Sequence, residues 1–132
     1  MVTEATTQQR ATLLIVDDEP ANLELLRRIF MRDSEVDTAR NGKEALQAIA
    51  TNAYDLVLLD IMMPVLSGID ALRIIRETPQ SADLPVILIS ALSDSEQIAS
   101  GLKMGANDYI AKPFDITVIK ARVNTQLKIK RL

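Results

Sequence analysis

The chain has 132 residues, of which 48% are hydrophobic, and a formal net charge of −3, with no cysteine and no histidine. Its length and hydrophobic content suit one domain with a single core, and its acidic balance argues against direct binding to nucleic acid, which normally requires a basic face. The missing residue types exclude disulfides, thiolate chemistry, histidine-based triads and most zinc or haem sites, which leaves carboxylates, lysine, hydroxyls and the backbone for any chemistry.

Residues 1–11 are polar and lack the apolar centre of a signal peptide, and no later run approaches the length of a membrane span. We therefore expect a flexible N-terminal leader over 1–11 and one domain over 12–132. A soluble protein of the cytoplasm, with no membrane partner, is the corresponding expectation.

A strand, an acidic loop and a helix are predicted first. The continuous apolar run Leu13–Val16 is typical of a strand that is buried on both faces. It ends in the acidic loop Asp17–Glu19. Pro20 suits the first turn of a helix, and apolar residues then recur at helical spacing as far as Phe30.

The middle of the chain repeats this alternation. Glu35–Ala39 alternates weakly and is charged, as an edge strand would be, and Asn41 with the glycine after it predicts a turn into a short helix. Leu56–Leu59 is the next buried strand, and Asp60 follows it directly. After a loop, a further apolar stripe predicts a helix that stops before Pro79.

The C-terminal part predicts two more strands and two more helices. Val86–Ile89 is apolar throughout, and Ser93–Glu96 matches a capping box at the start of the fourth helix, which Gly105 ends. Asp108–Ala111 reads as a brief fifth strand. The fifth helix begins at about Asp115.

Five strands that alternate with five helices predict an α/β fold with a parallel sheet covered on both faces. In such doubly wound sheets, ligands bind beyond the carboxyl ends of the strands, where the strand order reverses. We therefore expect the functional residues at the strand ends.

Polar side chains follow four of the five predicted strands, namely Asp17 and Asp18, Asp60, Ser90 and Lys112. If the first and third strands are neighbours, three carboxylates converge, and their repulsion requires a cation. Lys112 supplies one charge, and a hard divalent ion such as Mg²⁺ suits an all-oxygen site. Taken alone, the first two carboxylates are equally typical of a helix cap, but a cap does not account for the other strand-end groups.

The stretches "LLIVDDEP", "LVLLDIMMPVLSGID", "VILISA" and "GANDYIAKPF" occur in this order, and with them residues 12–130 resemble a response regulator receiver domain. The resemblance implies a single doubly wound (βα)5 flavodoxin-like domain whose five-stranded parallel sheet has the order 2-1-3-4-5. It also implies a cytoplasmic bacterial protein of a two-component system.

The same resemblance implies a role for each strand-end residue. Asp60 is expected to be the phosphoacceptor, and Lys112 to pair with the phosphoryl oxygens. Asp17, Asp18 and Asp60 are expected to hold Mg²⁺, or Mn²⁺ in its place, together with the backbone carbonyl of Met62.

Ser90 and Tyr109 fall at the two switch positions of the family, the hydroxyl that moves toward the phosphoryl group and the aromatic ring that turns inward with it. The bond between Lys112 and Pro113 is expected to be cis. Met62 and Leu92 fall at the variable positions that flank the phosphoryl group, and because both are apolar we expect slow self-hydrolysis.

The implied function is a signalling switch that assists its own phosphorylation and dephosphorylation, rather than an enzyme with a separate substrate. A sensor histidine kinase or a histidine phosphotransfer protein would donate the phosphoryl group. The face formed by the fourth helix, the fifth strand and the fifth helix would then change its contacts, including homodimerisation. The ending "TQLKIKRL" has no stop signal, so the last helix is expected to lead toward an absent output domain; its basic residues favour a helix dipole over nucleic acid.

Three alternatives use the same fold. A magnesium-dependent aspartyl-phosphate phosphohydrolase would need a general acid two residues after its nucleophile, where this chain has Met62. A flavin-binding protein would need hydrogen-bond donors in the first loop, which is acidic here. A pseudo-receiver that binds partners without phosphorylation is disfavoured because every expected site residue is present.

Overall fold

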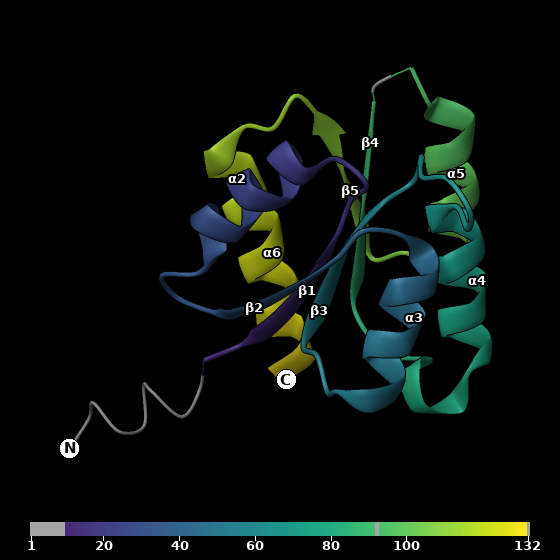
Figure 1. The fold of residues 1–132 in the computed structure, drawn as a ribbon, viewed down its shortest axis with the longest axis horizontal. Coiled ribbons are helices and arrows are strands. Elements are labelled where there is room, and N and C mark those ends of the chain that lie inside the picture. The colour runs from purple at the N-terminus through teal and green to yellow at the C-terminus, as the bar shows by residue number, and fades with distance from the viewer. Residues whose placement is uncertain (1–9, 92, 132) are drawn as a thin grey trace.

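Five parallel strands form the centre of the molecule in the order β2-β1-β3-β4-β5 (Figure 1). The computed structural model describes residues 10–91 and 93–131, so most of the expected leader lies outside the described residues. The strands are β1 (Thr12–Val16), β2 (Glu35–Ala39), β3 (Leu56–Asp60), β4 (Val86–Ala91) and β5 (Asp108–Lys112). The predicted fold class and strand order are confirmed.

Helices cover both faces of the sheet (Figure 1). They are α2 (Pro20–Phe30), α3 (Gly42–Thr51), α4 (Gly68–Glu77), α5 (Ser95–Met104) and α6 (Ile116–Arg131), with a short 3₁₀ turn, η1 (Pro79–Ser81), before β4. The helices α2 and α6 lie on one face, and α3, α4 and α5 lie on the other. None of the helices within the described ranges is long and apolar enough to cross a membrane.

The apolar runs of the central strands serve two cores at once. Along β3, Leu56 and Leu58 belong to the core under α2 and α6, whereas Val57 and Leu59 belong to the core under α3, α4 and α5. Successive side chains of a strand point to opposite faces, so a strand covered on both sides must be apolar at every position. Asp60, the last residue of this strand, is the exception.

Three helix ends follow the chemistry of their terminal residues. Asn41 caps α3 by accepting a hydrogen bond from the Glu44 amide at 2.8 Å, and Ser67 caps α4 by accepting from the Asp70 amide at 3.2 Å. Gly105 ends α5 with a φ of 119°, a left-handed conformation that glycine adopts without strain.

The predicted capping box at Ser93–Glu96 is wrong. The N-cap residue of α5 is Asp94, and its side chain makes no capping hydrogen bond. Instead, one of its carboxylate oxygens accepts a hydrogen bond from the Ser90 hydroxyl at 2.9 Å. The Asp94 carboxylate, which the capping-box pattern does not use, therefore bonds to the end of β4 and not to its own helix.

Arg76 fastens the amino edge of the sheet, opposite the ends that carry the polar residues. From the last turn of α4, its guanidinium donates to the carbonyls of Gly105 at 3.0 Å and Ala82 at 3.2 Å, and to the Asn107 side chain at 3.0 Å. The same Asn107 oxygen accepts from the amide of Val86 at 2.9 Å. One side chain thus joins α4, the C-terminus of α5 and the starts of β4 and β5.

The loop between β3 and α4 contains a strained residue. Val65 has a φ of 73°, and the Leu66 amide donates to the Pro64 carbonyl at 2.8 Å, which closes a γ-turn around it. A β-branched residue rarely adopts positive φ. The side chain is 84% exposed, so little burial offsets the strain.

Replacing Val65 by glycine should therefore stabilise the protein. We expect Val65→Gly to raise the free energy of unfolding by about 1 kcal/mol, because relief of strain exceeds the added flexibility of the unfolded chain. Urea denaturation measures this change. Val65→Ala is the matched control: it keeps the Cβ atom and should gain clearly less. A glycine variant no more stable than the wild type would contradict the assignment of strain.

Candidate functional site

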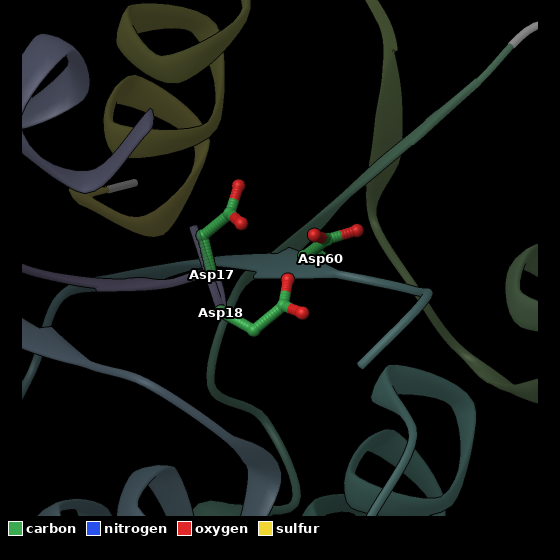
Figure 2. A group of neighbouring side chains, drawn as sticks. All are labelled: Asp17, Asp18 and Asp60. Atoms are coloured by element: carbon green, nitrogen blue, oxygen red, sulfur yellow. The ribbon is translucent and has the colours of Figure 1, made fainter. Parts of the chain in front are cut away.

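Three aspartates converge at the carboxyl edge of the sheet (Figure 2). Asp17 and Asp18 follow β1, and Asp60 ends β3, its direct neighbour. Since β2 lies on the other side of β1, the strand order reverses between β1 and β3, where doubly wound sheets bind ligands. One carboxylate oxygen from each of the three lies within 4.8 Å of the others.

Two of these carboxylates are removed from solvent. Asp17 is 0% exposed and Asp60 is 2% exposed, whereas Asp18 is exposed. Oδ1 of Asp17 accepts from the Glu19 amide at 2.9 Å, and Oδ1 of Asp60 accepts from the Met62 amide at 3.2 Å. Oδ2 of Asp17 is buried without a hydrogen-bond partner among the described residues. A buried charged oxygen without a partner is costly, so it marks a place for a cation.

Lys112 provides the cation that the site itself contains. Its Nζ lies 3.1 Å from Oδ2 of Asp60 and 3.7 Å from Oδ2 of Asp17. Burial alone lowers the pKa of Lys112, but the hydrogen bond to Asp60 and the neighbouring carboxylates outweigh burial, and the pKa is raised. Lys112 therefore stays protonated, and one positive charge faces three carboxylates.

The electrostatics of Asp60 show that this balance is incomplete. Burial, followed by the charge of Asp17, raises the pKa of Asp60 to about 6 despite the opposing effects of Lys112 and the Met62 amide. Near neutral pH the group is therefore mostly ionised, but held in an environment that disfavours its charge.

The site fits a hard divalent cation. Its donors are carboxylate oxygens, one of them buried without a hydrogen bond among the described residues, and the exposed Asp18 leaves a side open to solvent. Mg²⁺ and Mn²⁺ prefer oxygen ligands and commonly use only a few carboxylates, with water or phosphate oxygens filling the remaining positions. The acidic cluster thus has the composition and accessibility of a divalent-metal site.

Among the described residues, no side-chain hydrogen bond joins Ser90 or Tyr109 to this cluster. Ser90, 1% exposed on β4, directs its hydroxyl to Asp94 and to the carbonyl of Ala91 at 3.1 Å. Tyr109, half-buried on β5, has the Arg122 guanidinium 5.7 Å from its ring centre. The Lys112–Pro113 bond is cis, as expected.

Two further residues shape the site but were not predicted to do so. Gly68 begins α4 so close to β3 that a methyl group there would overlap the Asp60 carbonyl. Asp94, which was assigned only to a capping box, fixes the Ser90 hydroxyl. The glycine could have been found from its place in "MPVLSG"; the serine–aspartate contact has no local signal. Leu92 lies outside the described residues.

Comparison with known proteins gives one consistent family. The family model described as "Response regulator receiver domain" matches residues 13–124. The receiver domain of the Francisella response regulator 1452 has a TM-score of 0.82 and 39% identity, over 90% of this chain and 98% of that one. The chain is also 39% identical to a Vibrio cholerae protein named "Probable cyclic di-GMP phosphodiesterase" and 38% identical to the DNA-binding response regulator MtrA of Mycolicibacterium smegmatis.

These two relatives are much longer than the region they share with the chain. The alignments cover 92% and 90% of this chain, but only 28% and 51% of the respective relatives. The activities in their names are activities of those whole proteins.

The raised pKa of Asp60 predicts how stability depends on pH without metal. Because the folded state holds this proton more tightly than the unfolded chain, the free energy of unfolding should fall as pH rises from about 4 through 6. Asp60→Asn lacks this contribution, so the variant should become more stable than the wild type by about 2 kcal/mol at pH 7, with a smaller difference at pH 4.5. Urea denaturation of both proteins in a chelating buffer measures this change; a difference independent of pH would contradict it.

Proposed function

The chain belongs to the response regulator receiver domain family and is therefore the receiver of a two-component system, in which we propose that Asp60 accepts the phosphoryl group. The observation that carries this assignment is the contact of Oδ2 of Asp60 with Lys112 at 3.1 Å, inside a cluster that also holds Asp17 and Asp18. Within the cluster, the hydrogen bond from the Lys112 ammonium goes to Asp60, whereas Asp17 lies 3.7 Å from that ammonium.

The proposed step is transfer from a phosphohistidine to an Asp60 carboxylate oxygen. The new O–P bond forms as the N–P bond breaks, and the bonding electron pair stays with the imidazole. Asp60 attacks in its ionised form, which its pKa of about 6 makes the main form at neutral pH. The Lys112 ammonium then faces the transferred oxygens, and the Met62 amide restrains the carboxylate.

We propose that Asp17, Asp18 and Asp60, with the backbone carbonyl of Met62, hold Mg²⁺ at this site, and that Mn²⁺ can replace it. Oδ2 of Asp17, which is buried, accepts no hydrogen bond among the described residues and lies 3.7 Å from the Lys112 ammonium, supports this assignment. When bound, the metal neutralises charge on the phosphoryl oxygens. The chain's own contribution is to fix the carboxylates at the edge of a rigid sheet.

A receiver domain is a signalling switch, and a two-component system implies a histidine kinase as its partner. The direct donor is proposed to be that sensor kinase or a histidine phosphotransfer protein. Ser90 and Tyr109 would carry the change from the site to the face formed by α5, β5 and α6. Because much of each longer relative lies outside the alignment, we propose that the domain, over residues 12–132, controls an output domain or a separate partner.

Incubation with Mg²⁺ and acetyl phosphate tests the assignment. Intact mass should show one added phosphoryl group on the wild type and none on Asp60→Asn or in a chelating buffer. Lys112→Ala should slow the reaction by about a hundredfold, because one charge-stabilising donor is lost. Asp33→Asn, at an exposed acid outside the cluster, is the control and should react normally. Absence of an adduct on the folded wild type would favour the pseudo-receiver alternative.

The α5, β5 and α6 face is also the proposed dimer interface. Leu102 on α5 and Ile116 and Val118 on α6 are large, exposed apolar side chains, and a pocket of about 220 Å³ lies beside Val118 and Arg122. Large exposed apolar side chains are a common component of surfaces that another protein covers. A second phosphorylated copy is the proposed occupant.

A charge on this face should prevent dimerisation. We expect the wild type treated with Mg²⁺ and acetyl phosphate to double in mass by light scattering, and Val118→Glu to remain monomeric while still gaining the phosphoryl group. Ile74→Glu, at an exposed apolar residue on α4, is the matched control and should dimerise. Dimers of Val118→Glu would place the interface elsewhere.

A further inference from the structure

The carboxylate of Asp94 has two possible hydrogen-bond roles, one toward its own helix and one toward Ser90. It is the N-cap residue of α5, and its backbone carbonyl accepts the first helical hydrogen bond from the Ile98 amide at 2.9 Å. Its side chain makes no hydrogen bond to the first turn of the helix. The carboxylate instead accepts from the buried hydroxyl of Ser90, four residues earlier, at 2.9 Å.

The Ser90 hydroxyl can serve one strong acceptor at a time. It has a single proton, and its acceptors in this structure are the Asp94 carboxylate and the Ala91 carbonyl. A phosphoryl group on Asp60 would offer another charged acceptor. Donation to that group requires the Ser90 proton to leave Asp94, so the two hydrogen bonds exclude each other.

Release of Ser90 would leave Asp94 free beside unsatisfied donors. The first amides of an α-helix have no partner within the helix, and an aspartate at the N-cap is among the best acceptors for them. The backbone of Asp94 already holds the N-cap position. Its φ of −92° and ψ of 37° lie outside the extended conformation usual at an N-cap, so forming the missing cap requires a rotation of its side chain together with a change in ψ.

We propose that Asp94 is a positioning residue that holds the Ser90 hydroxyl away from the phosphoryl site at rest and caps α5 once Ser90 is released. This inference rests on the proposed function, because it takes Ser90 as the hydroxyl that turns toward phosphorylated Asp60. The carboxylate of Asp94 thereby links occupancy of the site to the N-terminus of α5.

Two substitutions separate the restraint from the cap. Asp94→Ser keeps a good capping residue but is too short to replace the contact with Ser90, whereas Asp94→Asn keeps an acceptor for both without the charge. Glu96→Gln is the matched control, since it removes one negative charge from the first turn of the same helix. The readout is amide NMR of the ¹⁵N-labelled protein, untreated and with Mg²⁺ and beryllofluoride, a stable mimic of the phosphoryl group.

We expect the α5 amide signals of untreated Asp94→Ser to move along the line that joins untreated and beryllofluoride-treated wild type. The ratio of activated to resting protein should rise about tenfold, because a hydrogen bond to a charged group is lost. Asp94→Asn should show a smaller rise, and Glu96→Gln should match the wild type. In a Ser90→Ala background, Asp94→Ser should cause no additional rise.

Signals of Asp94→Ser at the wild-type position, or a rise that persists without the Ser90 hydroxyl, would overturn the inference. If the wild type still gains a phosphoryl group on Asp60 in the same experiment, the proposed function would stand despite either result. A wild type that neither gains that group nor responds to beryllofluoride would overturn both.

Discussion

Repulsion between buried carboxylates is the constraint on which this structure depends. Asp17 and Asp60 lie at neighbouring strand ends, where Lys112 is the cation that the described residues place beside both, and an apolar pair would cost the fold less. The sequence retains a charge that the folded chain cannot neutralise alone. Binding of a cation, or covalent modification of one carboxylate, would relieve this repulsion and stabilise the site. The local instability is thereby connected to a signalling role.

The rest of the fold keeps this repulsion in place. The order β2-β1-β3 makes the ends of β1 and β3 adjacent, and the two apolar cores fix both strands from opposite faces. Gly68 allows α4 to begin directly against the Asp60 peptide. The carboxylates therefore cannot relax by moving apart, because they lie at the ends of two hydrogen-bonded strands whose apolar residues are buried.

The sequence predicted the sheet, its helices and the Asp60–Lys112 pair, because continuous apolar runs that alternate with helices are typical of buried parallel strands, whose polar ends meet at one edge. It did not predict the conformation of Val65 or the use of Asp94. Val65 lies at positive φ in the γ-turn between β3 and α4, and the Asp94 carboxylate accepts from Ser90 on β4; no sequence pattern marks either the positive φ or this choice of donor. Local sequence patterns identify which groups can accept a hydrogen bond, but not which donor they bond to in the folded protein.

The hydrogen bonds of Arg76 hold one end of α5 in place, so a movement of this helix would be a tilt about that end. They hold the Gly105 carbonyl at the C-terminal end of the helix, while the opposite end begins at Asp94 beside the site. Ten helical residues span about 15 Å, so a tilt of about 10° about Gly105 displaces the first turn by about 2.5 Å and barely moves the last. A change the size of one hydrogen bond at the strand ends is thereby converted into a surface displacement large enough for another protein to sense.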